Sequence, residues 1–443
     1  MNTSEIGKQE LDNNFGYKNL SRGVKSKATK LLYSLSDQVF TVGATFAANV
    51  LLARVDTHAG YGTFVLIYSI FTFLSGIHNA LVLEPYTVFA AGKYRNVFSD
   101  YLQLFMRINA VIGAGLALLV LIVAGVLYFW WPEWFSITLL GLAAAVLFVF
   151  TGAFARRTFY VNFDARLAAF MSMAFFATVS IGLTILYYQQ KVNGFSVFLV
   201  LAMGWLVASP VFFFKYPIRS GARRFISSHH RYWSGHWNYA RWVLATALVF
   251  QLLGQGYLWI TGILLSVEDV ASLKAVQNIV SPVNLIFSSI SLLILPRMAH
   301  AFQQQSIAGL TPIVRRLLVA VLGASALFIL FIYAAGNPIL NLVYAGKYNT
   351  ALPLLYIIAL TPAALGLGNV FNDTLKAMEH PKSVFYAYLG GGLTTILAGV
   401  PLILAFGLTG AAWGMVLSSL IYGVVLMNSY HKFVRTVGTI PAC

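Results

Sequence analysis

The chain has 443 residues, of which 59% are hydrophobic and only 9% are charged, and its mean hydropathy is +0.77. Soluble globular proteins carry roughly 25% charged residues, so the composition excludes that class and indicates a protein that crosses a membrane several times. Its long, continuous apolar runs predict helical spans of about 20 residues, not the short alternating segments of a β-barrel.

The first thirty residues are polar and basic and contain no apolar core followed by a cleavage site. They predict a cytoplasmic tail and not a signal peptide that is removed. Cys443 is the only cysteine. The chain therefore cannot form an internal disulfide or a metal site built from several cysteines.

Twelve apolar runs follow in chain order, six before the midpoint and six after it. We predict spans at about 32–53, 62–83, 107–129, 135–155, 167–188 and 195–214, and then at 242–265, 275–296, 313–335, 351–373, 384–406 and 409–429. The predicted fold is an all-α polytopic membrane protein with two six-helix lobes. Its segments are a tail at 1–30, an N-lobe at 31–214, a linker at 215–241, a C-lobe at 242–429 and a tail at 430–443.

The basic residues test this count, because Lys and Arg collect in the cytoplasmic loops of membrane proteins. Of the 29 basic residues, all except Arg54, Lys191, Lys274 and Lys347 lie in segments that the count places on one side. We therefore predict that both termini are cytoplasmic. The same residues account for the net charge of +16 as topology determinants and contacts to anionic lipid headgroups, and not as a nucleic-acid surface.

The stretch 215–241 is the longest strongly polar interruption after the N-terminus. Its histidines, His229, His230 and His236, could suggest a metal site, but they lie among Trp, Tyr and Arg residues. Amphipathic aromatic side chains next to Arg are typical of the headgroup level of a membrane. We interpret the stretch as an inner-leaflet anchor that joins the lobes.

The two halves resemble each other in sequence. Pro85 closes the second predicted span and Pro296 closes the eighth, and the same offset superimposes the seventh span on the first. An even number of spans per half gives both copies the same orientation. The pattern predicts a pseudo-two-fold axis along the membrane normal, with a cleft between the lobes.

Few ionisable residues lie inside the predicted spans, where a charge costs about 2.5–3.5 kcal/mol on insertion scales. Asp37 lies in the first span, Glu84 at the end of the second and Asp373 at the end of the tenth. Each is a candidate for function. The alternative is an interfacial carboxylate that pairs with a nearby Lys or Arg.

Polar residues at helical spacing indicate which faces turn away from lipid. The face of the eighth span carries Gln277, Ser281, Asn284, Ser288 and Ser291. Similar spacing relates Asp37 to Thr41, Gln251 to Gln255, and Asn369 to Asn372 or Asp373, and it places Asn79 on a small-residue face of the second span. Helix packing through small and hydroxyl residues is the alternative explanation. Burying an Asn or Gln side chain without hydrogen-bond partners costs more free energy than burying a Ser or Thr. The helix faces that carry Asn and Gln therefore favour a water-filled cavity.

The sequence contains no P-loop, no HExxH and no Gly-x-Ser-x-Gly. These absences argue against an ATP-driven pump, a zinc protease or a membrane hydrolase. We expect a protein that is not an enzyme and has no cofactor, with coupling to H⁺ or Na⁺ as an open possibility.

Several short motifs together resemble one family. They are AsnValLeuLeuAlaArg at 49–54, TyrGlyThrPhe at 61–64, SerProValAsnLeuIle at 281–286, LeuProArgMetAla at 295–299, ValTyrAlaGlyLysTyr at 343–348, GlyLeuGlyAsnValPheAsnAsp at 366–373 and GlyLeuThrGlyAlaAlaTrpGly at 407–414. In order and spacing they look like the polysaccharide or lipid-linked oligosaccharide flippases. That family, which includes the O-antigen flippases, shares a superfamily with the multidrug and toxin extrusion antiporters.

The resemblance implies twelve helices in two lobes around a central cavity that opens alternately to each side of a bacterial plasma (inner) membrane. It implies a polyprenyl-diphosphate-linked saccharide as cargo, and polysaccharide polymerase or glycosyltransferase machinery as partners. Since the cargo's head is anionic, cationic and amide groups should line the inner mouth of the cavity. Arg107, Arg156 and Arg297 lie near that depth.

One departure keeps two alternatives open. The lipid-flipping branches carry arginines in the first span, whereas this chain has no basic residue between Lys30 and Arg54 and carries Asp37 there. A cation-coupled drug antiporter and a non-transporting scaffold of a polysaccharide synthase complex are the alternatives. The predicted cavity residues are Asp37, Thr41, Asn79, Glu84, Arg107, Arg156, Gln251, Gln255, Gln277, Asn284, Arg297, Asn369, Asn372 and Asp373.

Overall fold

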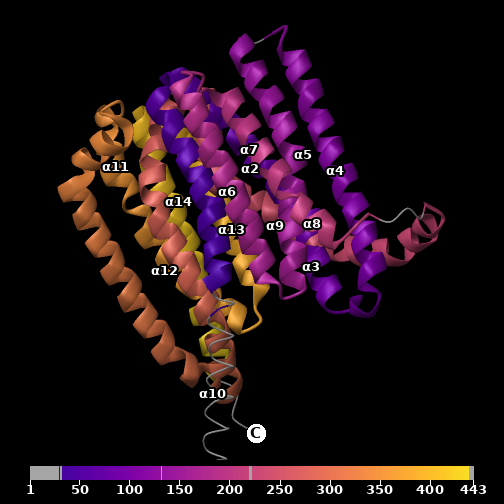
Figure 1. Ribbon diagram of the computed structural model, residues 1–443. Coiled ribbons are helices and arrows are strands. Elements are labelled where there is room, and N and C mark those ends of the chain that lie inside the picture. The colour runs from indigo at the N-terminus through magenta and orange to yellow at the C-terminus, as the bar shows by residue number, and fades with distance from the viewer. Residues whose placement is uncertain (1–28, 30–31, 131, 219–221, 439–443) are drawn as a thin grey trace, which may run out of the picture.

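The computed structural model describes residue 29 and residues 32–130, 132–218 and 222–438. Most of the predicted N-terminal tail and the last five residues, which include Cys443, lie outside the described residues. Within them the fold is all-α (Figure 1). After a first helix at Leu32–Val55 come α2 (His58–His78), η1 (Asn79–Leu83), α3 (Glu84–Ala91), η2 (Arg95–Val97), α4 (Phe98–Leu127), α5 (Glu133–Val161), α6 (Ala165–Tyr188), α7 (Gly194–Ala208), α8 (Pro210–Lys215), α9 (Ala222–Leu264), α10 (Val267–Tyr344), η3 (Asn349–Ala351), α11 (Leu352–Ile358), α12 (Thr361–Ala377), α13 (Pro381–Leu397) and α14 (Gly399–Gly438).

The predicted fold class is confirmed. Eleven helices in the described part of the chain are long and apolar enough to cross a membrane. Two labelled helices each contain a break, because Ser306 in α10 and Gly407 in α14 have positive φ angles of 52° and 58°. If α13 is counted together with α14 up to Gly407 as one crossing, the number of crossings is the predicted twelve.

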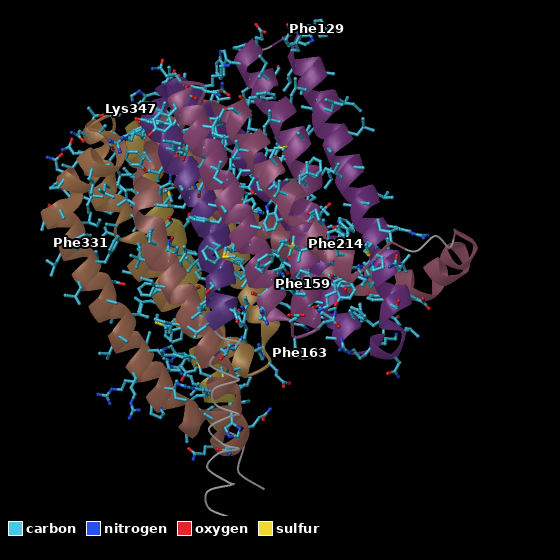
Figure 2. The ribbon with its side chains drawn as sticks, in the orientation of Figure 1. Phe129, Phe159, Phe163, Phe214, Phe331 and Lys347 are labelled. Carbon is cyan, nitrogen blue, oxygen red and sulfur yellow. The ribbon has the colours of Figure 1, made fainter. Side chains whose placement is uncertain are left out.

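The loops alternate between two ends of the molecule, as the span count requires. Phe129, between α4 and α5, and Lys347, between α10 and η3, lie at one end, whereas Phe163, between α5 and α6, lies at the other (Figure 2). We name these the Lys347 end and the Phe163 end. The charge asymmetry predicts that the Phe163 end faces the cytoplasm.

Much of the polar stretch at the midpoint of the chain is helical. Helix α9 begins at Ala222 and continues without a break into the seventh span, where it ends at Leu264. One of its histidines differs from the expectation of a membrane-surface position, because His236 is only 1% exposed. The helix therefore carries part of the linker sequence into the protein interior.

The hydrophobic core shows how the two halves meet. One cluster combines N-half side chains such as Tyr61 and Phe64 with C-half side chains such as Val270 and Tyr344. A separate cluster, which includes Phe371, holds together the remainder of the C-half. The shared cluster includes side chains from both ends of α10, which lie at the Lys347 end of the molecule. The halves therefore form one continuous core at that end.

Helices α2 and α10 come unusually close at the same end. A Cβ atom on Gly62 would lie 1.9 Å from the carbonyl oxygen of Val267, a distance that no side chain permits. Glycine therefore allows the first turns of the two helices to touch through their backbones. This contact fixes the spacing between the halves at the Lys347 end.

Candidate substrate pathway

The N-half carries a buried ion pair between the first helix and α5. The carboxylate of Asp37 is fully buried and accepts two hydrogen bonds from Arg156, from Nε at 2.8 Å and from Nη2 at 2.6 Å. It also accepts hydrogen bonds from the hydroxyls of Tyr160 and Ser172. Thr41 donates to the Ser172 hydroxyl at 3.1 Å. The structure thus brings Asp37, Thr41 and Arg156 together, and both carboxylate oxygens already have charged or hydroxyl donors.

A second polar group surrounds a turn of π-helix that interrupts the second span at η1. Asn79 opens this turn, and its side-chain oxygen accepts a hydrogen bond from Arg157 at 3.2 Å. Glu84 follows the turn and accepts a hydrogen bond from the Tyr239 hydroxyl of α9 at 3.4 Å. The Leu81 carbonyl has no donor four residues on, because Pro85 lacks an N–H, and His236 Nε2 donates to it at 2.7 Å. These contacts bind α9 to the N-half near the Phe163 end.

The seam between the halves contains two of the predicted glutamines. Gln251 of α9 is buried and donates to the Thr72 carbonyl of α2 at 2.6 Å, whereas Gln255, one turn later, is partly buried. Trp259 donates to the Ser69 hydroxyl at 2.6 Å. Gln277 turns away from this seam and contacts the Met415 sulfur of α14 at 3.3 Å.

Lys274 is the residue of this region that the sequence analysis missed. The prediction placed it in a loop, but α10 begins at Val267, so Lys274 lies inside the eighth span, about 10 Å along the helix. It shares a face with Gln277 and Ser281, and it is close in angle to Asn278, which donates to the Tyr61 hydroxyl of α2 at 2.9 Å. Lys274 therefore lies within one helical turn of a contact between the halves.

The Lys274 ammonium is partly buried. Among the side chains that the structure describes, none forms a hydrogen bond or an ion pair with it. Intramembrane cations normally pair with an acid or with carbonyl groups. An unpartnered ammonium inside a membrane span is therefore a group that a ligand can satisfy.

The C-half contains a polar cavity of about 390 Å³. Its walls come from α9, α10, α12, α13 and α14, and they include four of the predicted site residues. Asn372 and Asp373 are almost completely buried there. The residues that line the cavity are Phe250, Leu253, Asn284, Ser291, Leu365, Asn369, Asn372, Asp373, Lys376, Tyr388 and Tyr422.

The two remaining predicted residues lie apart from these groups. Arg107 is partly buried on α4, and Arg297 is exposed on α10. Thirteen of the fourteen predicted positions therefore divide among the buried ion pair, the π-turn, the seam, the C-half cavity and these two separate arginines, and Gln277 lies apart from them against Met415.

At the Lys347 end, the C-half contacts the end of the first helix directly. The Lys347 ammonium donates to the carbonyl oxygens of Asp56 and, at 3.2 Å, of Ala53. His58 Nε2 donates to the Lys347 carbonyl at 3.3 Å. Burial lowers the pKa of Lys347, and the charge of Asp56 opposes this effect. Burial raises the pKa of Asp56, against the opposing effects of a hydrogen bond from Thr57 and the charge of Lys347.

Known proteins resemble the chain in both sequence and fold. The family model named MatE matches residues 243–400. A solved structure of an inward-facing multidrug resistance MATE family transporter of the MOP superfamily has a TM-score of 0.76 at 10% identity, covering 91% of this chain and 96% of that one. The lipid II flippase MurJ in an inward closed conformation has a TM-score of 0.70 at 15% identity, covering 90% and 87%.

A mutant of the MATE transporter VcmN from Vibrio cholerae is also similar, with a TM-score of 0.63 at 17% identity, covering 93% of this chain and 98% of that one. These structures include one described as a flippase and two described as MATE transporters, and all share one architecture. The chain therefore shares the fold of these transporters, and residues 243–400 match the MatE family model.

Proposed function

We propose that the protein is a flippase that moves a polyprenyl-diphosphate-linked oligosaccharide across the bacterial plasma membrane by alternating access, with its saccharide head in the space between the halves. The observation that carries this proposal is Lys274, an unpartnered cation within a membrane span and one helical turn from a contact between the halves. A diphosphate satisfies such a group with a charge-assisted hydrogen bond. A cationic drug would be repelled by it.

The state of Asp37 supports the same choice. An antiporter that used this carboxylate would need to release it to a proton or metal ion in each cycle. Here Arg156, Tyr160 and Ser172 all bind it. Arg156 already neutralises its charge, so a cation gains little by binding. We assign Asp37 a structural role, which ties the first helix to α5 and α6.

The decisive experiment uses the Lys274→Met variant in proteoliposomes that contain a fluorescent polyprenyl-diphosphate-linked oligosaccharide. The lost charge-assisted contact contributes about 1.5–3 kcal/mol, so we expect the flipping rate to fall at least about tenfold. Thermal stability should remain equal or rise, because the variant removes an unpaired charge from the membrane interior. This combination of results separates a ligand contact from a structural role.

Two control variants complete the experiment. Lys274→Arg keeps the charge and should retain most of the flipping rate. Lys191→Met removes an exposed lysine from the loop after α6 and should change nothing. If Lys274→Met flips the lipid at the normal rate, the proposed substrate contact is wrong. If the intact protein flips no lipid-linked saccharide while surface polysaccharide still requires the protein in cells, the scaffold alternative is favoured.

A cation-coupled antiporter is the second candidate, and the C-half cavity favours it. Asp373 is a buried carboxylate beside Asn369 and Asn372 in a cavity large enough for water and a small ion. On this alternative we expect Asp373→Asn to abolish drug export driven by a proton or sodium gradient. Asp37→Asn, once its effect on folding is taken into account, should leave coupling intact.

A further inference from the structure

One lysine makes a charge-assisted contact between the halves at the Lys347 end. Lys347 belongs to the loop after α10, yet its ammonium bonds to backbone carbonyls of Ala53 and Asp56 where the first helix ends. The C-terminal end of a helix has unpaired carbonyls and a partial negative charge, which a cation stabilises. Lys347 thus acts as a C-terminal cap that is supplied by the opposite half of the molecule.

Aromatic side chains seal the space directly beneath this lysine. Tyr61, Tyr344 and Tyr348 are each at most 1% exposed. The Tyr348 ring contacts His58 edge-on, with centroids 4.9 Å apart, and lies 6.3 Å from the Tyr61 ring. Tyr344 donates to the Ala275 carbonyl at 2.9 Å. Solvent at this end therefore has no open path along the seam through these rings.

The seal is built to separate as well as to close. Its two sides come from different halves, and besides the Lys347 bonds they are joined by single hydrogen bonds, ring contacts and the hydrophobic cluster that the halves share at this end. At Gly62 the contact is made by the backbone of Val267, without a side chain on the α2 side. Opening the seal separates this shared cluster, whereas the second cluster lies within the C-half and stays intact.

We propose that Lys347 holds a reversible gate closed, and that release of its ammonium from the carbonyls of Ala53 and Asp56 opens the Lys347 end. The inference rests on the proposed alternating-access function, and it names the contact that must break in every cycle. The gate comprises Lys347 with the ring cluster of His58, Tyr61, Tyr344 and Tyr348.

A cysteine reporter behind the gate tests the proposal independently of transport. Ala275→Cys, introduced into a Cys443→Ser background, places a thiol at a fully buried position beneath Tyr344. In membranes, a small charged methanethiosulfonate reagent is added from the Lys347 side. We expect Lys347→Met to increase the labelling rate at least about tenfold, the effect of losing one charge-assisted bond. Lys347→Arg should change it much less.

The control is Lys191→Met, which removes an exposed lysine from a loop that the span alternation places at the same end. It should not affect labelling. Equal elution profiles in size-exclusion chromatography show that the variants are folded. If the reporter thiol reacts equally slowly in folded Lys347→Met and in the parent protein, Lys347 does not hold the gate closed.

A cross-link provides the complementary measurement. A His58→Cys and Tyr348→Cys pair, joined by a short cleavable reagent, should reduce flipping of the lipid-linked saccharide to background, and reduction should restore it. Continued flipping while the cross-link is intact overturns the gate. If Lys347→Met opens the reporter site but no variant flips the lipid, the gate stands and the proposed substrate is wrong.

Discussion

The Asp37 and Arg156 side chains were each predicted as cavity residues, and in the structure they bind one another. They are 119 positions apart, and no local pattern in the sequence could reveal this pairing. A carboxylate and a guanidinium that share two hydrogen bonds form a planar, directional contact. Their functional meaning therefore depends on the packing of the first helix against α5.

We expect Asp37→Asn to destabilise the protein by about 3–5 kcal/mol, because Arg156 would remain largely buried without its counter-charge. Thermal unfolding in detergent measures the change. A double variant, Asp37→Asn with Arg156→Gln, should recover most of the loss, since it removes both charges together. If the double variant is less stable than Asp37→Asn alone, Arg156 does not depend on Asp37.

Asp56 should make stability depend on pH. Burial raises its pKa above the ordinary value of 3.8, so the folded state holds the proton more tightly than the unfolded chain does. Its stabilising contribution is complete below pH 3.8 and is lost as the pH rises through the folded-state pKa. We expect Asp56→Asn, which mimics the protonated form, to flatten the pH dependence of Tm in acid.

This effect is measured as the difference between the Tm profiles of the variant and the parent protein. His58 and Lys347 face the same region and are present in both proteins, so the comparison removes their titration. Asp100→Asn, at an exposed position on α4, is the matched control and should leave the profile unchanged. Parallel profiles for Asp56→Asn and the parent would show that the carboxylate titrates normally.

The existence of each helix was predictable from its own residues, because crossing a membrane requires a local run of apolar side chains. The residues at which helices begin and end were less predictable. The eighth span begins at Val267 because the Ser266 hydroxyl caps its first turn, accepting from the Asp269 backbone at 3.0 Å. The acidic first turn and Lys274 lower the local hydropathy, so the predicted span started too late and Lys274 was assigned to a loop.

The contact between α9 and the π-turn should be important for the stability of the seventh span. His236→Leu keeps an apolar body but leaves the buried Leu81 carbonyl without a donor, which costs about 1–3 kcal/mol. Thermal unfolding should show this loss. Trp242→Leu, at a side chain that is 70% exposed on the same helix, should have little effect. Equal stability of the two variants would contradict the assigned role of the bond.

At the scale of the whole molecule, two of the polar faces predicted from helical spacing, those of the eighth and tenth spans, meet in one cavity in the C-half. Asn284, Asn369 and Asp373 each belonged to a predicted face, and all line that cavity. The contacts that join the halves were not predictable, because Lys347 and Ala53 are 294 positions apart. The spacing of polar residues along one helix identifies its interior face, but it does not identify the neighbouring helix that packs against that face.

The charge asymmetry predicts an orientation for the whole molecule, and one native thiol can test this prediction. Cys443 should react with a membrane-impermeant maleimide only after spheroplasts are permeabilised, because the prediction places the C-terminus in the cytoplasm. Lys191→Cys in a Cys443→Ser background should react without permeabilisation. The opposite labelling pattern would show that the Lys347 end faces the cytoplasm.

Helix α9 also couples the two halves mechanically. Its part in the seventh span, from Gly235 to Leu264, is an unbroken helix of about 45 Å. His236 anchors it to the N-half, and it packs against both α2 of the N-half and α13 of the C-half. A helix without a break transmits rotation instead of absorbing it. We therefore expect a flexible insertion in the middle of this segment to uncouple movement of α2 from movement of α13.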